Sequence, residues 1–167
     1  MHAILAEATQ AGECCAVVDC RDAFDPASAS AAGVDLKRVL WVRAGRAMAP
    51  GSRSMQKLPM EKAMRAADMI LHSGGFGVVV LDLCETAAGE LNSIPLSYWY
   101  RFRRAVENTP SRLVVASHVP LVKACAPLQL ETRRERAAWE GLLFAGIECA
   151  VETRKQRGWM VGQALAG

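Results

Sequence analysis

Continuous runs of apolar residues recur along this chain and are separated by segments with helical spacing. The runs are CCAVVD (14–19), RVLWVR (38–43), GVVVLDLCE (77–85) and SRLVVASH (111–118). An unbroken apolar run of this length is typical of a strand that is covered on both faces, as the strands of parallel sheets are. The pattern therefore predicts a sheet that is built mainly of parallel strands.

Helical spacing fills the intervals between these runs. Helices are predicted over MHAILAEATQAG (1–12), DPASASAAG (25–33), EKAMRAADMILHSGG (61–75) and LSYWYRFRRAVEN (96–108). In the first, Ile4, Leu5, Ala8 and Ala11 belong to the expected buried face. In the second, Asp25 is the predicted N-cap. Because strands and helices alternate at a spacing of about 30 to 40 residues, βαβ crossovers and an α/β fold class are predicted.

The C-terminal part of the chain has a different pattern. PLQLETRR (127–134) and GLLFAGIECAVETRKQRG (141–158) contain strand-like stretches without a crossover helix between them. FAGIE (144–148) is similar to a tight turn that joins two strands. Antiparallel strands are therefore predicted at one edge of the sheet. Because no long linker divides the chain, one domain is predicted over residues 1–167.

Composition places the chain among ordinary globular proteins. Of its 167 residues, 51% are hydrophobic and 22% are charged. No segment approaches the roughly 18 apolar residues of a membrane span, and the N-terminus lacks the features of a secretory signal, so a cytoplasmic protein without membrane contact is expected. The net charge of +3 is too small to identify a partner. Since the six cysteines form no CxxC pair, no zinc site is expected, and most of them are predicted to be buried thiols.

Polar side chains end three of the predicted strands. Asp19, Asp82 and the pair Ser117 and His118 follow apolar runs directly. Parallel strands end at the same edge of a sheet, and open α/β folds bind ligands at that edge, so it is the candidate site. Asp82 is interpreted either as a magnesium ligand or as a strand-end acid that is hydrated or hydrogen-bonded. His118 is interpreted either as a conformational switch or as a satisfied polar group.

Three segments resemble the core of the bacterial RecA recombinase family. AILAEATQAGECCAVVDCRDAFDPASASAAGVDLKRVLWV (3–42) has a helix, a strand that ends in Asp, Ala-x-Asp-Pro, a short helix and Gly-Val-Asp at matching spacing. LHSGGFGVVVLDL (71–83) looks like the Walker B strand of the family, and VVASHV (114–119) looks like its phosphate-sensor strand. The resemblance implies a RecA-like, P-loop NTPase-type sandwich of three layers.

The resemblance also assigns candidate nucleotide-binding positions. Asp82 falls on the Walker B acid that holds magnesium, and Ser117 and His118 fall on the sensor strand. Asp25 falls on the acid that contacts adenine, although its position before a proline is equally explained by a helix cap. Ser28 replaces the tyrosine that stacks on adenine in the family.

Two elements that ATP hydrolysis requires in that family are missing from the matched positions. Arg21 stands where the family has its catalytic glutamate, and a cation can neither accept a proton nor orient water in the same way, so no catalytic residue is expected. The sequence contains no Gly-x-x-x-x-Gly-Lys-Ser/Thr loop, the Walker A motif, which would precede the first helix. The resemblance therefore implies no cofactor for this chain alone, and ATP with Mg²⁺ if a segment upstream of Met1 carries the loop.

A basic and aromatic segment is a candidate for nucleic-acid contact. In YWYRFRR (98–104), Arg101, Arg103 and Arg104 are interleaved with aromatic residues that could stack on bases, which makes them candidates for weak contacts with single-stranded DNA. The alternative is a helix that packs its aromatic residues in the core and exposes the arginines as a solvated surface.

The losses favour a non-catalytic accessory protein of DNA repair, recombination or the SOS response, similar to ImuA-type paralogues of RecA. A RecA-type filament, the translesion polymerase machinery or a second copy of the chain are the expected protein partners, and single-stranded DNA is a further one. Arg154 and Lys155 look like the family's basic residues that reach a neighbouring subunit's phosphates. The alternatives are a fragment of an ATP-dependent recombinase that binds single-stranded DNA, and an interaction module whose basic tail docks on a filament end.

Overall fold

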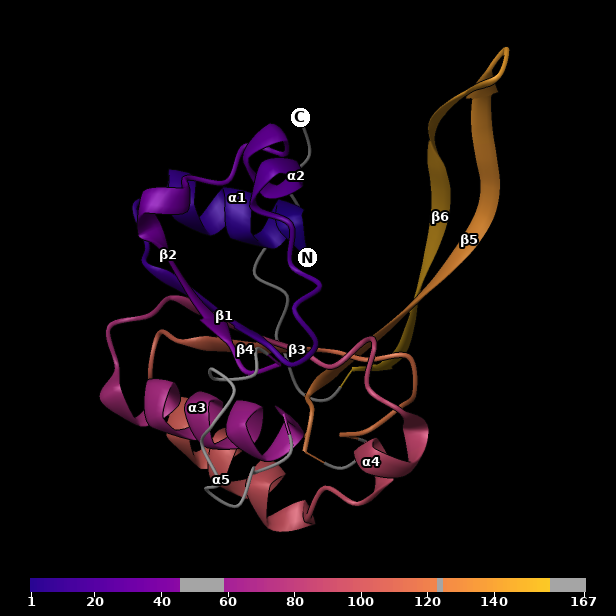
Figure 1. The fold of residues 1–167 in the computed structure, drawn as a ribbon. Coiled ribbons are helices and arrows are strands. Elements are labelled where there is room, and N and C mark those ends of the chain that lie inside the picture. The colour runs from indigo at the N-terminus through magenta and orange to yellow at the C-terminus, as the bar shows by residue number, and fades with distance from the viewer. Residues whose placement is uncertain (46–58, 123–124, 157–167) are drawn as a thin grey trace, which may run out of the picture. The chain divides into compact units, whose positions relative to one another are not determined.

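The chain forms two compact units, Met1–Leu121 and Val122–Gly167 (Figure 1). The computed structural model describes residues 1–45, 59–122 and 125–156. In these residues the first unit holds helices and parallel strands, and the second holds an antiparallel pair of strands. Each unit is described by itself, and the single domain over residues 1–167 stays a prediction.

The first unit is built on a parallel sheet. Within the described residues this sheet has four strands in the order β2-β1-β3-β4, namely β1 Cys15–Asp19, β2 Val39–Arg43, β3 Val78–Asp82 and β4 Arg112–Ala116. Every pairing between them is parallel, which confirms the α/β class and the parallel sheet. The central strands β1 and β3 are completely buried, as their unbroken apolar sequences predict, whereas β2 and β4 are partly exposed.

Helices cover both faces of this sheet (Figure 1). The described helices are α1 His2–Gln10, α2 Pro26–Ala31, the 3-10 helix η1 Leu36–Arg38, α3 Pro59–Ser73, α4 Ala88–Asn92 and α5 Leu96–Val106. α1 and α2 lie on one side of the sheet, and α3 and α5 lie on the other. The helices predicted from the sequence do not include α4. This five-residue helix has no side-chain cap at Ala87, so its sequence carries no start signal.

The core on the α1 side contains alternate residues of the two central strands. Its buried members are Leu5, Ala6, Ala8, Cys15, Val17, Phe24, Ala29, Val34, Val78 and Val80. Leu5 is fully buried, whereas Ile4 is 40% exposed and Ala11 is exposed. The predicted face of α1 is therefore confirmed at Leu5 and Ala8 and wrong at Ile4 and Ala11, because Thr9 turns inward and satisfies its hydroxyl within the helix.

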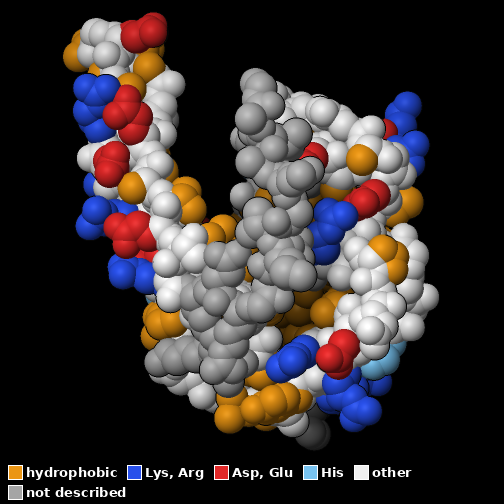
Figure 2. All heavy atoms as spheres, turned by 180° about the vertical axis from the view of Figure 1, so that it is seen from behind, with side chains coloured by type: hydrophobic (Ala, Val, Ile, Leu, Met, Phe, Trp, Pro, Cys, Tyr) orange, Lys and Arg blue, Asp and Glu red, His pale blue; other side chains and the backbone are white. Residues whose placement is uncertain are grey.

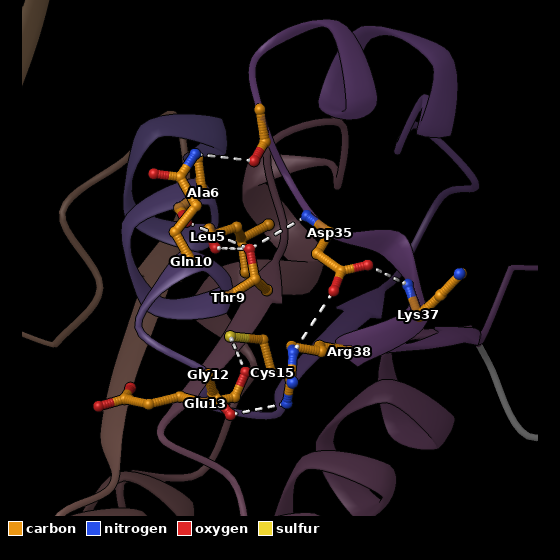
Figure 3. A network of polar contacts seen from close by, with 11 residues as sticks. Leu5, Ala6, Thr9, Gln10, Gly12, Glu13, Cys15, Asp35, Lys37 and Arg38 are labelled. Carbon is orange, nitrogen blue, oxygen red and sulfur yellow. Dashed lines mark hydrogen bonds and ion pairs between the residues drawn. The ribbon is translucent and has the colours of Figure 1, made fainter.

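Hydrogen bonds connect α1 and the residues that follow it to the segment before β2 (Figure 3). The Thr9 hydroxyl donates to the carbonyl of Leu5 at 2.8 Å and accepts from the N–H of Asp35 at 3.1 Å. Arg38 Nη1 donates to the carbonyl of Gly12 at 2.8 Å. Because Thr9 is 2% exposed, these bonds satisfy a hydroxyl whose burial without a partner would cost about 1–3 kcal/mol. The network fixes the start of β2 beside β1.

Asp25 caps α2, as predicted. Its carboxylate accepts from the N–H of Ala27 at 3.1 Å and from the N–H and the hydroxyl of Ser28. The Ser28 hydroxyl, followed by the two N–H groups, holds the pKa of the Asp25 carboxyl below its usual value. Pro26 occupies the first turn, where its missing N–H costs nothing.

The cysteines divide equally between buried and exposed positions. Cys15, Cys20 and Cys125 are buried, whereas Cys14, Cys84 and Cys149 are exposed. The prediction that most of them are buried thiols is therefore wrong. Two of the exposed cysteines lie just before and just after buried strands, and the third lies on a two-stranded ribbon.

The second unit contains that ribbon. β5 Leu128–Glu140 pairs with β6 Leu143–Gln156 in antiparallel register. The antiparallel pairing is confirmed, but its predicted place at the edge of the parallel sheet is wrong, because within the described residues β5 and β6 form a sheet of their own. The strands have 13 and 14 residues and pair along most of their length, so the backbone groups that face the partner strand are hydrogen-bonded and the alternate groups face outward.

The turn of the ribbon lies at Gly141 and Leu142, so the predicted turn at FAGIE (144–148) is wrong. Gly141 has a φ of 64°, which glycine adopts without a steric penalty. Gly146 pairs instead with Ala138, next to a register shift that is typical of a β-bulge. A glycine within a strand commonly marks such a bulge, which is why this signal was misleading.

One face of the ribbon carries ion pairs. Arg136 Nη2 lies 2.7 Å from a carboxylate oxygen of Glu148, and Arg154 Nε lies 2.5 Å from one of Glu131. Figure 2 shows basic and acidic side chains interspersed along the ribbon. Because each of these four side chains is more than half exposed, water screens the pairs and they contribute little to the stability of the fold.

Candidate functional site

The ends of β1, β3 and β4 meet at one edge of the parallel sheet. Asp19 lies beside Asp82 in the register of β1 and β3, and Asp82 lies beside Ala116 in the register of β3 and β4. Ser117 and His118 follow Ala116 directly. The structure therefore brings together the polar residues that the sequence predicted at this edge.

Asp19 is a buried carboxylate whose two oxygens are both occupied. Its Oδ1 accepts from the N–H groups of Arg21 at 3.2 Å and Ala23 at 3.0 Å. Its Oδ2 accepts from the N–H of Phe24 at 2.8 Å and from the indole N–H of Trp41 at 3.2 Å. Since Asp19 is 1% exposed, this carboxylate builds the loop after β1 and is not accessible to a ligand.

Arg21 is held by an acid that sequence reasoning missed. One Nη of Arg21 donates to both carboxylate oxygens of Glu90, at 2.7 and 2.8 Å. Glu90 belongs to α4, so the pair joins the loop after β1 to the helix after β3. The position that the resemblance aligns with a catalytic glutamate is therefore occupied by a cation whose charge is already balanced. No local signal pairs residues so far apart in sequence.

Asp82 is the acid at the end of β3. It is 9% exposed, and its Oδ1 accepts from the N–H of Cys84 at 3.0 Å. Although Cys84 is exposed as a residue, partial desolvation of its thiol, followed by the charge of Asp82, raises the pKa of Cys84 to about 11. The structure thus shows a hydrogen-bonded strand-end acid, and a magnesium role for Asp82 stays a prediction.

Ser117 and His118 both bond to the backbone of loops at this edge. The Ser117 hydroxyl donates to the carbonyl of Val119 at 2.6 Å. His118 Nδ1 lies 2.9 Å from the carbonyl of Cys84, and because a carbonyl only accepts, Nδ1 carries the proton. This bond ties the loop after β4 to the loop after β3. His118 is a satisfied polar group, and its role as a switch stays a prediction.

The side chains at this edge that could bind Mg²⁺ are the carboxylates of Asp19 and Asp82. Mg²⁺ usually binds through one or two carboxylates and takes its remaining ligands from water and phosphate oxygens. Within the described residues, no three His, Cys, Asp or Glu side chains gather as a metal site. Asp82 suits the role better than Asp19, whose oxygens are both occupied. The described residues therefore fit Mg²⁺ only together with a phosphate group that supplies further oxygens.

The remaining nucleotide candidates lie elsewhere. The Asp25 carboxylate is used by the cap of α2, and its contact with adenine stays a prediction. Arg154 lies in the second unit, where the Glu131 carboxylate raises the pKa of its guanidinium. Lys155 pairs with Gln129 in the ribbon, and its side chain lies outside the described part of the structure.

The arginines of α5 are exposed, whereas two of its aromatic residues are buried. Trp99 and Phe102 are 3% and 1% exposed, and their rings meet edge to face at 5.9 Å. The exposed arginines of this helix are Arg101, Arg103 and Arg104. The predicted packing is confirmed for Trp99 and Phe102, and so is the basic surface, whereas Tyr100 is 51% exposed. Contact of this surface with DNA stays a prediction.

Comparison with known proteins gives no assignment. No protein-family model matches the chain, and a search of curated proteins finds no match. Of the helices in the described ranges, none has the length and apolar character of a membrane span.

Proposed function

We propose that this chain is a RecA-like, non-catalytic accessory protein of DNA repair and the SOS response, which acts in the cytoplasm through contacts with proteins and with single-stranded DNA. The ion pair between Arg21 and Glu90 carries the proposal. The resemblance places at Arg21 the glutamate that positions the attacking water. A guanidinium stays protonated at physiological pH and accepts no hydrogen bond, so it cannot take over that role.

The rest of the edge supports the same proposal. Asp19, Ser117 and His118 all make hydrogen bonds to the chain's own loops. These bonds hold the loops after β1, β3 and β4 in place. The edge is therefore organised as a stable surface, which suits a protein that binds partners more than one that turns over a substrate.

ATP hydrolysis tests the proposal. The full chain is expected to release no phosphate from ATP and Mg²⁺ above the buffer control, with or without single-stranded DNA. Asp82→Asn is the matched control, because it removes the Walker B-like carboxylate and leaves a similar shape. DNA-stimulated turnover that disappears in Asp82→Asn would contradict the proposal, whereas turnover that survives in the variant identifies a contaminating ATPase.

An ATP-dependent recombinase is the second candidate, and the edge strand β4 favours it. Within the described residues β4 pairs only with β3, which leaves room for a further strand beside Ser117. A phosphate-binding loop on such a strand would complete the donor set around Asp82. An in-frame Gly-Lys-Ser/Thr segment upstream of the Met1 codon, in a longer protein that binds ATP, would favour this candidate.

The proposed protein partners are a RecA-type filament, the translesion polymerase machinery and a second copy of the chain. Arg154 and Lys155 are the proposed filament contacts. Co-sedimentation with an assembled RecA filament tests this contact, with Arg133→Ala on the same ribbon as the control. A loss of sedimentation in Arg154→Ala but not in Arg133→Ala is expected. Equal sedimentation of both variants and the unchanged protein would remove Arg154 from the interface.

A further inference from the structure

A groove with a basic lining runs between α3 and α5. It has a volume of about 360 Å³ and is lined by His72, Arg101, Arg104 and Ala105. His72 lies in the last turn of α3, and Arg104 lies in the last turn of α5. The groove belongs to the first unit and is formed by helices, whereas the candidate nucleotide site lies at the strand ends. It is therefore a separate feature of the molecule.

The two arginines of the groove differ in their partners. Arg101 forms an ion pair with the carboxylate of Asp68, and its Cζ lies 5.9 Å from the centroid of the Tyr98 ring. Arg104 makes no ion pair and no hydrogen bond with any residue in the described part of the chain. The positive charge of Arg104 is therefore uncompensated in the groove.

Packing prevents these cations from turning inward. Trp99 and Phe102 fill the buried side of α5, so the opposite side of the helix must face solvent. Tyr100 lies four positions before Arg104 on the exposed side and is 51% exposed. An exposed aromatic ring one helical turn from an unpaired guanidinium is a combination with which proteins stack a base and neutralise its phosphate.

We infer that the groove binds the phosphate backbone of single-stranded DNA, with Arg104 as the principal contact and Arg101 as a second contact that Asp68 restrains. The inference names the DNA-binding surface of the proposed function and rests on it. The lining favours an extended polyanion, because small-molecule sites are mostly apolar with few polar groups, whereas two of the four lining side chains here are guanidinium cations. Asp68 lowers the local positive charge and so limits the affinity.

Helix stability gives Arg104 a competing role. A cation in the last turn of a helix interacts favourably with the partial negative charge of its C-terminus, and Arg104 lies in the last turn of α5. A purely stabilising role predicts that Arg104→Gln lowers the unfolding temperature and leaves DNA binding unchanged. The phosphate role predicts a change in DNA binding and in its salt dependence.

The test is a fluorescence titration of the full chain with a labelled oligothymidylate between about 50 and 200 mM salt. Arg104→Gln is expected to weaken binding and to lower the slope of log K against log salt by about 0.7, the value for one phosphate contact on a single strand. Asp68→Asn, which releases Arg101 from its ion pair, is expected to tighten binding. Arg136→Gln, which removes one exposed arginine from the ribbon, is the control and should leave the slope unchanged.

The outcomes separate this inference from the proposed function. If the unchanged protein binds DNA and the salt slopes of the unchanged protein, Arg104→Gln and Asp68→Asn are equal, the groove is not the DNA-binding site. The proposed accessory function would still stand. Displacement of the oligonucleotide by inorganic phosphate at the same phosphate concentration would also overturn it, because a strand with several contacts binds more tightly than one phosphate. ATP turnover that requires Asp82 would contradict the proposed accessory function. It would not contradict DNA binding in the groove.

Discussion

Arg21 and Glu90 lie 69 positions apart in the chain, yet one Nη of the arginine lies 2.7 and 2.8 Å from the two carboxylate oxygens. The pair joins the loop after β1 to α4 and so closes the edge of the sheet where the resemblance locates a nucleotide site. Its side chains are 31% and 34% exposed, so water screens this pair less than the pairs of the ribbon.

This difference in exposure predicts a measurable coupling between the two residues. In a double-mutant cycle with Arg21→Met and Glu90→Gln, urea unfolding should give a coupling free energy of about 1 kcal/mol. The same cycle on Arg136 and Glu148, whose side chains are 72% and 55% exposed, should give a value near zero. Equal coupling in the two cycles would show that Arg21 and Glu90 are only a surface pair.

Asp19 is expected to be the most sensitive polar position of the edge. In Asp19→Asn an amide NH₂ replaces one carboxylate oxygen and faces two N–H donors that lose their acceptor. Each unsatisfied buried donor costs about 1–3 kcal/mol, so the free energy of unfolding should fall by about 3 kcal/mol. Asp25→Asn is the control, because asparagine caps helices as well as aspartate does. Similar losses in both variants would contradict this account of Asp19.

Local patterns predicted much of the first unit. β1 and β3 are central and completely buried, and each has an unbroken apolar sequence. The sequence alone therefore identifies these two strands. The cap of α2 follows from the order of Asp25 and Pro26, because both act on the first turn of the same helix. These features depend only on residues that are close together in the sequence, so a local pattern is enough to predict them.

Features that depend on distant residues could not be predicted in the same way. The partner of Arg21 lies on α4, a helix without a start signal, and the pairing exists only once β1 and β3 are adjacent. The antiparallel strands were predicted at the edge of the parallel sheet because a strand-like sequence does not show which strand it pairs with. In the structure β5 and β6 pair with each other instead. Asp19 was correctly placed at the edge, but its four donors come from two separate segments.

The thiol of Cys84 is expected to react slowly below strongly alkaline pH. Because its pKa is raised to about 11, little thiolate is present near pH 8, and alkylation followed by mass spectrometry should label the exposed Cys14 and Cys149 first. Asp82→Asn removes a negative charge beside the thiol, so it should lower the pKa and speed the reaction of Cys84. Labelling of Cys84 as fast as Cys149 in the unchanged protein would contradict the raised pKa.

The same shift bears on stability at high pH. A group whose pKa is raised in the folded state stabilises the fold fully below its unfolded value, 9.0 for a cysteine here, and that stability is lost as the pH rises toward about 11. The unfolding temperature should therefore fall more steeply between these two pH values in the unchanged protein than in Cys84→Ser. Parallel pH profiles of the two proteins would show that the Cys84 thiol is not linked to folding.

The outer edge of β4 is expected to drive self-association. The N–H of Arg112 donates to the carbonyl of Gly77 at 2.8 Å, so by alternation Val114 also faces β3, whereas Leu113 and Val115 direct their N–H groups outward. Within the described residues these groups have no partner strand, and an unpaired row of this kind is a template for another strand. Size-exclusion chromatography of the purified chain should show association that rises with concentration.

Proline substitutions along β4 separate edge pairing from general instability. Leu113→Pro removes an outward N–H and keeps the bonds to β3, so the fold should persist while association weakens. Val114→Pro removes an inward bond and should destabilise the unit by about 3 kcal/mol or more. The contrast between adjacent positions is informative, because both variants replace a similar apolar side chain. If Leu113→Pro associates as strongly as the unchanged chain, association uses another surface, and the exposed apolar residues of the ribbon, such as Leu130 and Val151, are then the next to be changed.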